Sequence, residues 1–345
     1  MKQIKGGVTA AKGYEAASTA AGIKYQGRTD MALIYSQVPC VSAGTFTTNV
    51  VKAAPVKWDR QIVDSGAGVQ AVVVNSGIAN ACTGEEGMGY CKETAEAAAK
   101  ALNIDAAGVL VGSTGVIGMQ LPMQKLVDGI QILAGKKAEG LQSGHDAALA
   151  IMTTDTVEKE MAVEIEIGGK TVTIGGMSKG SGMIHPNMCT MLAFITTDAA
   201  ITKEALQKAL SEDVEDTYNM ISVDGDTSTN DTAILLANGL AGNQEITYAS
   251  PEYETFKEAL HMVNETLAKK MAGDGEGATA LFEVKVVGAE SIKQAKTLAK
   301  SVVCSNLTKA AIAGHDANWG RILCAMGYSG VQFDPEKVDL FFESK

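Results

Sequence analysis

The stretch that decides the fold is GMSKGSGMIHPNMCTMLAFITTDAAI, residues 176–201. Its first half is rich in Gly, Ser, Pro and Asn, which favour turns and loops. From Thr190 onward the stretch becomes an apolar run, which is typical of a buried strand. Two interpretations follow from this junction. Thr190 is either an ordinary first residue of a strand or a reactive threonine held at the end of a sheet.

The overall composition predicts a globular protein. The chain has 345 residues, which is enough for about two domains of roughly 150 residues each. A net charge of −11 argues against a nucleic-acid partner, because nothing is placed to neutralise phosphates. No secretory signal and no membrane-spanning run is evident, so we expect a cytoplasmic protein. The cysteines form no CxxC pair and are expected to be reduced: Cys40, Cys82, Cys91, Cys189, Cys304 and Cys324.

Strand-like and helix-like segments alternate along the chain. Apolar β-branched runs predict strands at 68–77, 106–118, 278–289 and 337–345. Helical spacing predicts helices at 84–103, 121–135, 202–222, 250–273 and 291–306, with Thr202 and Ser250 as N-caps. Residues 161–176 alternate around Gly168-Gly169, which indicates a hairpin. The pattern favours an α/β or α+β fold, a layered helix–sheet–helix architecture with mixed sheets.

Metal and nucleotide sites are not predicted. The four histidines are isolated, and residues 224–232 (DGDTSTNDT) lack the Gly and Glu that an EF-hand loop needs. We therefore interpret that segment as a polar loop, either near a site or simply rich in turns. The sequence contains no P-loop, no dinucleotide fingerprint and no GxSxG elbow at a strand-to-helix turn.

Three Gly-rich loops that carry hydroxyl and amide groups remain as candidates for chemistry. They are residues 75–84, 112–118 and 180–190, each placed next to an expected strand. Each alone is more often a turn than a site. Glycine at strand ends also lets backbone N–H groups approach a substrate closely, which is what an oxyanion hole requires.

This setting is compatible with a chemical role for Thr190. A threonine hydroxyl is a poor nucleophile unless a base lies beside it, and one solution is the residue's own α-amine, freed by cutting the preceding peptide bond. The α-amine has an ordinary pKa of about 7.7 to 8, which suits a general base near neutral pH. The loop before Thr190 and the strand after it fit this arrangement.

A resemblance to a known family rests on KGSGMIHPNMCTML (179–192) and seven further segments in order. These are FTTNVVKAAPV, NSGIANACTG, GSTGVIGMQLP, AIMTTDT, VDGDTSTNDT, GDGEGAT and DANWGRILCAMGYSG. Together they resemble the ornithine acetyltransferase (glutamate N-acetyltransferase) family of arginine biosynthesis, from about residue 5 to residue 340. The resemblance implies a fold similar to that of the aminopeptidases and ornithine acetyltransferases.

The resemblance also implies a mechanism. The Cys189–Thr190 bond is cut autocatalytically, giving an α chain of residues 1–189 and a β chain of residues 190–345 that assemble as an (αβ)2 heterotetramer. Thr190 then carries the acetyl group from N²-acetylornithine to glutamate in a ping-pong reaction. No cofactor is implied, although some family members also accept acetyl-CoA. Thr114 and Gly115 would form the oxyanion hole.

The same resemblance assigns substrate contacts to Thr153, Lys179, Thr190 and Glu276. From their charges, we expect Lys179 to meet a substrate carboxylate and Glu276 to meet an amine. The partners are therefore small molecules rather than nucleic acid or membrane.

Three departures from the family pattern stand out. Cys189 replaces the usual Ala before the cut, and Ile78 replaces an Asn, which is expected to remove a polar group near the site. The chain also ends about sixty residues before a C-terminal family motif. Two alternatives stay open at this point: a self-processing amidohydrolase or aminopeptidase in which water accepts the acyl group, and a truncated, inactive chain that only binds amino acids.

Overall fold

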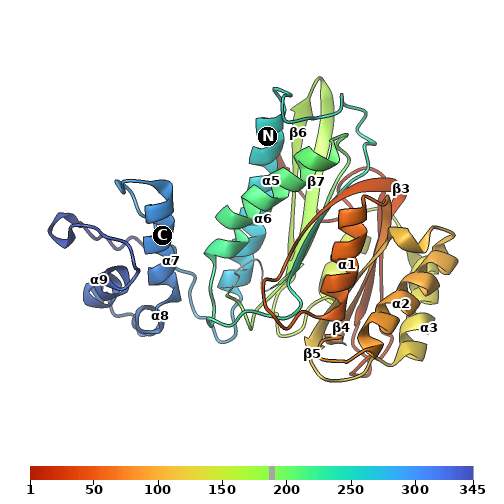
Figure 1. Cartoon of the computed structure of the whole chain (residues 1–345), viewed down its shortest axis with the longest axis horizontal. Coiled ribbons are helices and arrows are strands. Elements are labelled where there is room, and N and C mark those ends of the chain that lie inside the picture. Colours follow the sequence, from red (N-terminus) through yellow and green to blue (C-terminus); the bar gives the residue numbers. More distant parts are fainter. Residues whose placement is uncertain (186–190, 345) are drawn as a thin grey trace.

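One long strand, β3 (Met31–Phe46), organises the computed structural model of the chain, which describes residues 1–185 and 191–344 (Figure 1). The first part of β3 pairs with β2 (Tyr14–Thr19) and β4 (Val69–Ile78), whereas residues 41–46 pair with β9 (Thr232–Ala237). The register shifts between Tyr35 and Cys40, at the change of partners. The strand thus passes from one sheet segment to another.

The described strands join in the order β1-β6-β7-β8-β9-β3-β4-β5, with β2 added on β3. The pairs β8–β9 and β4–β5 are parallel and the other pairs are antiparallel, so the expectation of mixed sheets is confirmed. The β6–β7 pair turns at Gly168-Gly169, as the sequence predicts, and both glycines have positive φ. The remaining strands are β1 (Lys2–Ile4), β5 (Val109–Val116), β6 (Lys159–Ile167), β7 (Lys170–Lys179) and β8 (Leu192–Thr197).

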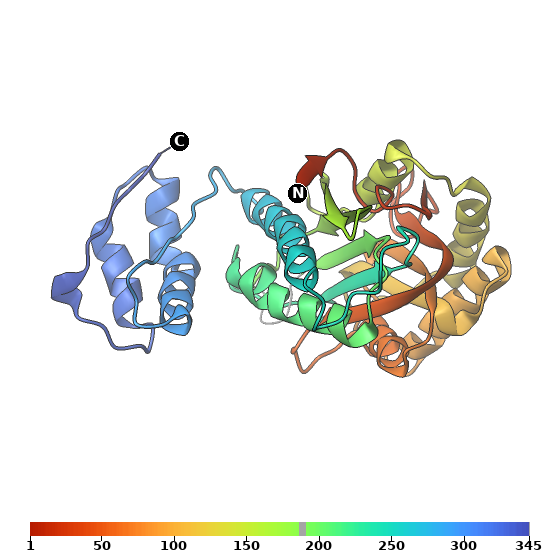
Figure 2. The same ribbon diagram turned by 90° about the horizontal axis from the view of Figure 1, so that it is seen from above.

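Helices cover both outer faces of the paired sheet segments. Figure 2 shows α5 (Lys203–Asp216) and α6 (Tyr253–Gly273) on one side and α2 (Glu86–Leu102) and α3 (Met123–Lys136) on the other. The other helices are α1 (Ala54–Ser65), α4 (Leu141–Ala150), α7 (Ile292–Cys304), α8 (Asn306–Ala313) and α9 (Trp319–Gly327). Thr202 caps α5 by accepting a hydrogen bond from the Ala205 N–H, as expected.

Three apolar clusters fill the spaces between these layers. The first lies between α5 and α6 and the strands β6 to β9, and includes Leu206, Phe256 and Leu260. The second lies between the two sheet segments, and the third packs β4 and β5 against α2 and α3. Burial of these apolar side chains supplies the main favourable free energy of folding. The layered α/β architecture predicted from the sequence is therefore confirmed, with two sheet layers between the helices.

The two segments predicted as strands near the C-terminus are not strands. Residues 278–289 and 338–344 have irregular backbone, and Lys337 ends a short 3₁₀ helix; none of them has a β-ladder partner among the described residues. Their apolar alternation fits a strand, but a strand also requires a neighbour to pair with. The predicted N-cap of α6 is also wrong, because Ser250 and Pro251 form a turn and the helix begins at Tyr253.

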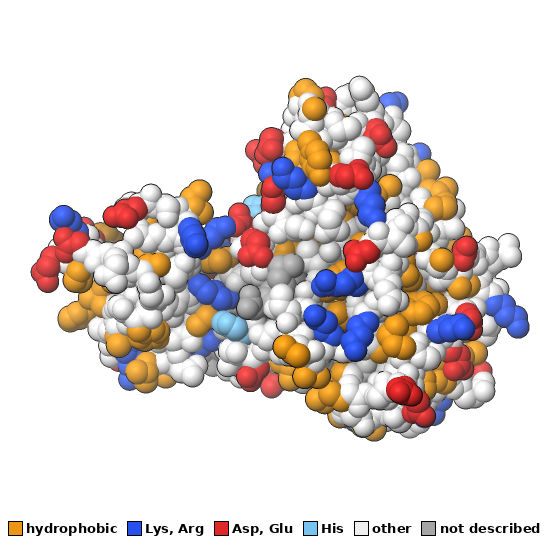
Figure 3. Space-filling model, in the orientation of Figure 1, with side chains coloured by type: hydrophobic (Ala, Val, Ile, Leu, Met, Phe, Trp, Pro, Cys, Tyr) orange, Lys and Arg blue, Asp and Glu red, His pale blue; other side chains and the backbone are white. Residues whose placement is uncertain are grey.

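Residues 282–344 form a small C-terminal unit beside the layered body. Its own apolar cluster contains Leu298, Val302, Ala325 and Met326. Lys296 makes an ion pair with Asp216 of the body. The outline of the molecule is notched between this unit and the body in the space-filling view (Figure 3).

The two chains expected from cleavage do not correspond to separate layers. The strands β8 and β9 follow the predicted cut, yet they lie between β7 and β3, which precede it. The segment β2-β3-β4-β5 therefore lies wholly before the cut, whereas the other segment contains strands from both sides of it.

The described residues also show the state of the cysteines and the character of the helices. Cys40 and Cys91 are buried, whereas Cys82 and Cys324 are exposed; these four and Cys304 are free thiols. None of the helices in the described ranges has the length and apolar character that a membrane span requires.

Candidate active site

A cavity of about 580 Å³ opens where the two sheet segments meet. It is lined by the ends of β5 and β7, the start of β8, the loops that follow α4 and α6, and the loop before β9. The structure brings together there every predicted site residue that it describes: Thr114, Gly115, Thr153, Lys179 and Glu276. Cys189 and Thr190 lie outside the described residues. Met191, directly after them, lines the cavity.

Gly115 occupies a position that no other residue fits. It lies on β5 opposite Gly77 of the parallel strand β4, and its φ of +130° is one that L-residues rarely adopt. A Cβ atom at this position would lie 2.3 Å from the carbonyl carbon of Gly77. The glycine therefore lets two backbones approach closely at the edge of the cavity, as an oxyanion hole requires.

Lys179 brings a buried positive charge to the same edge. Its side chain lies at the end of β7 with 8% exposure, and its Nζ donates a hydrogen bond to Thr114 Oγ1 at 3.3 Å. Because the Thr114 oxygen accepts from Lys179, its own O–H is left to donate elsewhere. Burial lowers the pKa of Lys179, and the carboxylates of Asp155 and Asp231 counteract this effect.

Thr153 and Glu276 are held in the cavity by backbone hydrogen bonds. The Arg28 guanidinium donates to the carbonyl oxygens of Met152 at 2.6 Å and Thr153 at 3.0 Å. The N–H of Glu276 donates to the Ser181 carbonyl at 3.2 Å. The Glu276 carboxylate fills the space beside Gly182, where a Cβ atom would meet Oε1 at 2.2 Å. The lining of the site thus includes the Lys179 ammonium at the end of β7 and the Glu276 carboxylate on the loop after α6.

Asn230 and Asp231 are site residues that the sequence alone did not single out. Asn230 donates from Nδ2 to the carbonyl oxygens of Ala79 at 2.6 Å and Ser113 at 2.9 Å, which ties its loop to β4 and β5. Asp231 is 1% exposed, and its Oδ2 has no hydrogen-bond partner within the described ranges. Burial raises the pKa of Asp231 well above its usual range. The only signal in the sequence is that both residues belong to the polar loop 224–232.

Ile78 does not lie in the cavity, contrary to expectation. Its side chain is 2% exposed and packs into the apolar cluster beneath α2 and α3. Successive side chains of a strand alternate between faces, so Gly77 and Ala79 line the cavity while Ile78 faces the core. Replacing an Asn at this position therefore changes the core and not the lining of the site.

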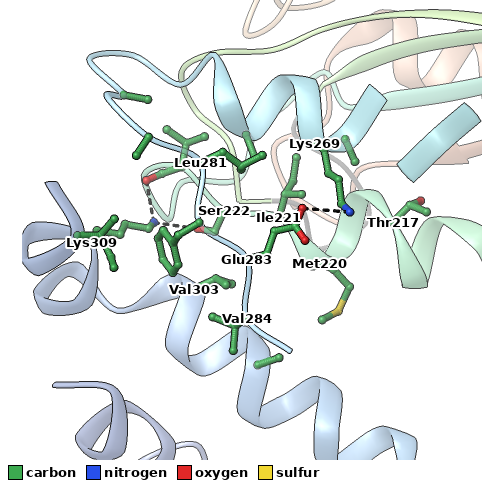
Figure 4. Close-up of a pocket in the computed structure, with 18 of the residues that line it drawn as sticks. Thr217, Met220, Ile221, Ser222, Lys269, Leu281, Glu283, Val284, Val303 and Lys309 are labelled. Carbon is green, nitrogen blue, oxygen red and sulfur yellow. Dashed lines mark hydrogen bonds and ion pairs between the residues drawn. The ribbon is translucent and has the colours of Figure 1, made fainter. Parts of the chain in front are cut away.

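A second cavity, of about 520 Å³, separates the body from the C-terminal unit (Figure 4). In this cavity Lys269 pairs with Glu283 at 3.1 Å, and Lys309 points to Ser222. Glu276 is the only predicted site residue that lines it among the described ones. The first cavity is therefore the candidate active site.

Comparisons with known proteins agree with this fold. A β-aminopeptidase from Burkholderia superimposes with a TM-score of 0.50 and 12% identity, covering 96% of each chain. This likeness shows the fold alone, a layered α/β architecture. The crystal structure of the arginine biosynthesis bifunctional protein ArgJ from Bacillus halodurans matches with a TM-score of 0.52 and 43% identity. That match covers 54% of this chain and 97% of the other.

The sequence comparison identifies the family. The ArgJ family model matches residues 15–345. The arginine biosynthesis bifunctional protein ArgJ of Symbiobacterium thermophilum is 55% identical over 343 residues, which is 99% of this chain and 85% of the relative. The chain belongs to the ArgJ family. This confirms the family expected from the motifs.

Proposed function

We propose that the protein is an acyltransferase of arginine biosynthesis that moves the acetyl group of N²-acetyl-L-ornithine to L-glutamate through an acetyl-Thr190 intermediate. The observation that carries the proposal is the cavity itself. Lys179, Glu276 and the glycine-mediated backbone approach at Gly115 converge beside Met191, the residue after the proposed nucleophile. Both substrates carry an amine and a carboxylate, which these two charges complement.

Activation of the nucleophile is the first step that we propose. The Thr190 oxygen attacks the carbonyl carbon of Cys189, and the C–N bond breaks to leave an ester and a free α-amine at Thr190. Water then hydrolyses the ester and releases the Cys189 carboxylate. The products are chains of residues 1–189 and 190–345, and the new amine is the base that the Thr190 hydroxyl needs.

Acetyl transfer then follows in two half-reactions. Thr190 Oγ attacks the acetyl carbonyl of acetylornithine while the α-amine takes the hydroxyl proton. The oxyanion is stabilised by donors from Thr114 and Gly115. The C–N bond breaks, and ornithine leaves with the proton on its amine. Glutamate next attacks the acetyl ester with its α-amine, and loss of one proton to the Thr190 amine releases N-acetylglutamate and the free hydroxyl.

The substrate contacts are those that the family resemblance implies, and the partners of Lys179 and Glu276 are assigned by charge. The Lys179 ammonium binds a substrate carboxylate, the Glu276 carboxylate binds a substrate amine, and Thr153 closes the cavity from the loop after α4. The reaction needs no cofactor, and acetyl-CoA as a second donor is tested by supplying it with glutamate in place of acetylornithine. The heterotetramer and the cytoplasmic location stay predictions from the sequence.

The test combines intact mass with an acetyl-transfer assay. We expect two polypeptides of about 20 and 16 kDa, in proportion to their 189 and 156 residues of a 35.8 kDa chain. We also expect labelled acetyl groups to appear on glutamate. Release of free acetate without dependence on glutamate would instead support the hydrolase alternative. A single uncut species without transfer would support the alternative of an inactive chain.

Lys179→Met tests the proposed carboxylate contact. Removing one member of a buried, hydrogen-bonded charge pair costs about 2–5 kcal/mol, so we expect kcat/KM for acetylornithine to fall at least ~30-fold. Lys203→Met is the control, because Lys203 donates to Val63 O at 2.6 Å and does not line the cavity. Its kcat/KM should stay within about twofold of wild type. Equal losses in the two variants would contradict the assignment of Lys179.

A further inference from the structure

A fully buried lysine forms the centre of a charge cluster behind the cavity. Lys159, the first residue of β6, has no exposed side-chain surface. Its ammonium lies 2.7 Å from Asp155 Oδ1 and 2.6 Å from Asp274 Oδ2. A buried charge is costly unless it is paired and hydrogen-bonded, so this arrangement holds all three groups together tightly. Lys159, Asp155 and Asp274 are called the Lys159 cluster below.

Asp155 connects the cluster to two of the loops that line the cavity. Its Oδ2 accepts a hydrogen bond from the N–H of Thr153 at 3.0 Å. Its Oδ1 also accepts from the N–H of Gly180 at 2.6 Å, directly after Lys179. The Asp155 carboxylate therefore fixes the backbone at Thr153 and next to Lys179.

Asp274 connects the cluster to the third loop. The Thr156 hydroxyl and N–H both donate to its carboxylate, which joins the loop after α4 to the loop after α6. The Asp274 carbonyl oxygen accepts from Ser181 Oγ at 2.6 Å, and the Ser181 carbonyl accepts from the N–H of Glu276. Glu276 is thus placed by Asp274 and Ser181 together.

We propose that the Lys159 cluster is the positioning device of the active site, in which Asp155 sets the place of Lys179 and Asp274 sets the place of Glu276. None of the three is a catalytic residue, because none lines the cavity. The inference rests on the proposed function only in assigning Thr153, Lys179 and Glu276 to the substrate. The hydrogen bonds that carry it involve described residues throughout.

Asp155 and Asp274 differ in how strongly their charges act on Lys179. The charged groups that act on Lys179 are Asp155, Lys159, Asp231 and Glu276, and Asp155 is the strongest of them. Burial lowers the pKa of Lys179; the three carboxylates raise it and Lys159 lowers it further. Without the charge of Asp155, Lys179 should lose its proton at a lower pH. Asp274 is not among these groups, so its charge should matter little to that titration.

The experiment compares Asp155→Asn with Asp274→Asn. In Asp155→Asn we expect the alkaline limb of kcat/KM for acetylornithine to move about one pH unit lower. In Asp274→Asn we expect kcat/KM to fall about tenfold or more, mainly through KM, with the limb unchanged. The proposal would be overturned if the alkaline limb of the kcat/KM profile stayed unchanged in both variants, or if it shifted equally in both.

A second readout keeps this test separate from the proposed function. The pKa of Lys179 is followed directly by NMR of ¹³Cε-labelled lysine, with the resonance assigned by its loss in Lys179→Arg. We expect this pKa to fall in Asp155→Asn whether or not the protein transfers acetyl groups. If the wild type shows no transfer, the proposed function fails while the NMR result still decides the coupling.

Two further variants control for structural damage. The double variant Asp155→Asn/Lys159→Met removes the attractive and the repulsive neighbour of Lys179 together, while the Asp274 carboxylate keeps its hydrogen bonds from Thr156. Its Lys179 pKa should lie between those of Asp155→Asn and wild type. Asp213→Asn removes a buried carboxylate that accepts from Asn264 at 2.6 Å and from His261, none of which lines the cavity. It should leave the Lys179 pKa unchanged, and a shift there would overturn the proposal.

Discussion

Thr190→Ala is expected to abolish both cleavage and acetyl transfer. Without the hydroxyl, no ester can form with the Cys189 carbonyl, so the chain should stay as one species of 35.8 kDa. Loss of a covalent nucleophile typically costs about 10⁴-fold or more in kcat, because the other groups of the site act only through it. Intact mass and a labelled-acetyl assay on the same preparation measure both effects.

Thr190→Ser is the matched variant. It retains a hydroxyl and, after cleavage, an α-amine, so we expect cleavage and measurable transfer, reduced but well above the level of Thr190→Ala. If Thr190→Ala keeps its acetyl-transfer rate, Thr190 is not the nucleophile, and the thiol of Cys189 becomes the first alternative to test.

Gly115→Ala is expected to lower kcat by about 10²- to 10³-fold. The added methyl group would lie 2.3 Å from the backbone of Gly77, so β4 and β5 must separate at the edge of the cavity. That movement displaces the proposed oxyanion donors, and loss of one such donor costs about 10²- to 10³-fold in kcat. Steady-state kinetics on the folded fraction, together with urea denaturation, measures the effect.

Gly118→Ala is the control variant that separates the effect of backbone strain from the effect of the clash between residues 115 and 77. Gly118 lies three residues further along with a φ of +75°, and no atom lies within 4 Å of the position that its Cβ would occupy. The variant incurs the strain of a left-handed alanine, about 1 kcal/mol, without moving β4. Its kcat should stay within about twofold of wild type. Equal losses at both glycines would show that the close approach at Gly115 has no special role.

The sequence predicted the residues of the cavity better than the arrangement that brings them together. Thr114, Gly115, Lys179 and Glu276 belong to short motifs that resemble those of a known family, and all four line one cavity. The hairpin at 161–176 and the cap at Thr202 are likewise local features. The order of the strands depends instead on long-range pairing, which no local pattern encodes.

The features that were predicted wrongly or not singled out from the sequence have the same physical origin. Residues 278–289 and 337–345 have the composition of strands, but strand formation depends on a neighbour. Lys159, between Glu158 and Glu160, looks like a solvated residue at a strand edge, although it has no exposed surface. Its partner Asp274 is 115 residues away, so the buried pair cannot be inferred from the sequence. The burial of Asp231 could likewise not be inferred from the sequence, because the residue belongs to a polar loop.

The interleaving of strands from both sides of the predicted cut affects how the protein refolds after it has unfolded. An intact chain that unfolds can return to its structure by itself, since all its strands are tethered in one molecule. Once cut, β8 and β9 can regain their places between β7 and β3 only if two separate polypeptides meet. Recovery after denaturation would then slow on dilution, as any second-order process does, and the persistence of the cut form would be governed by its unfolding rate.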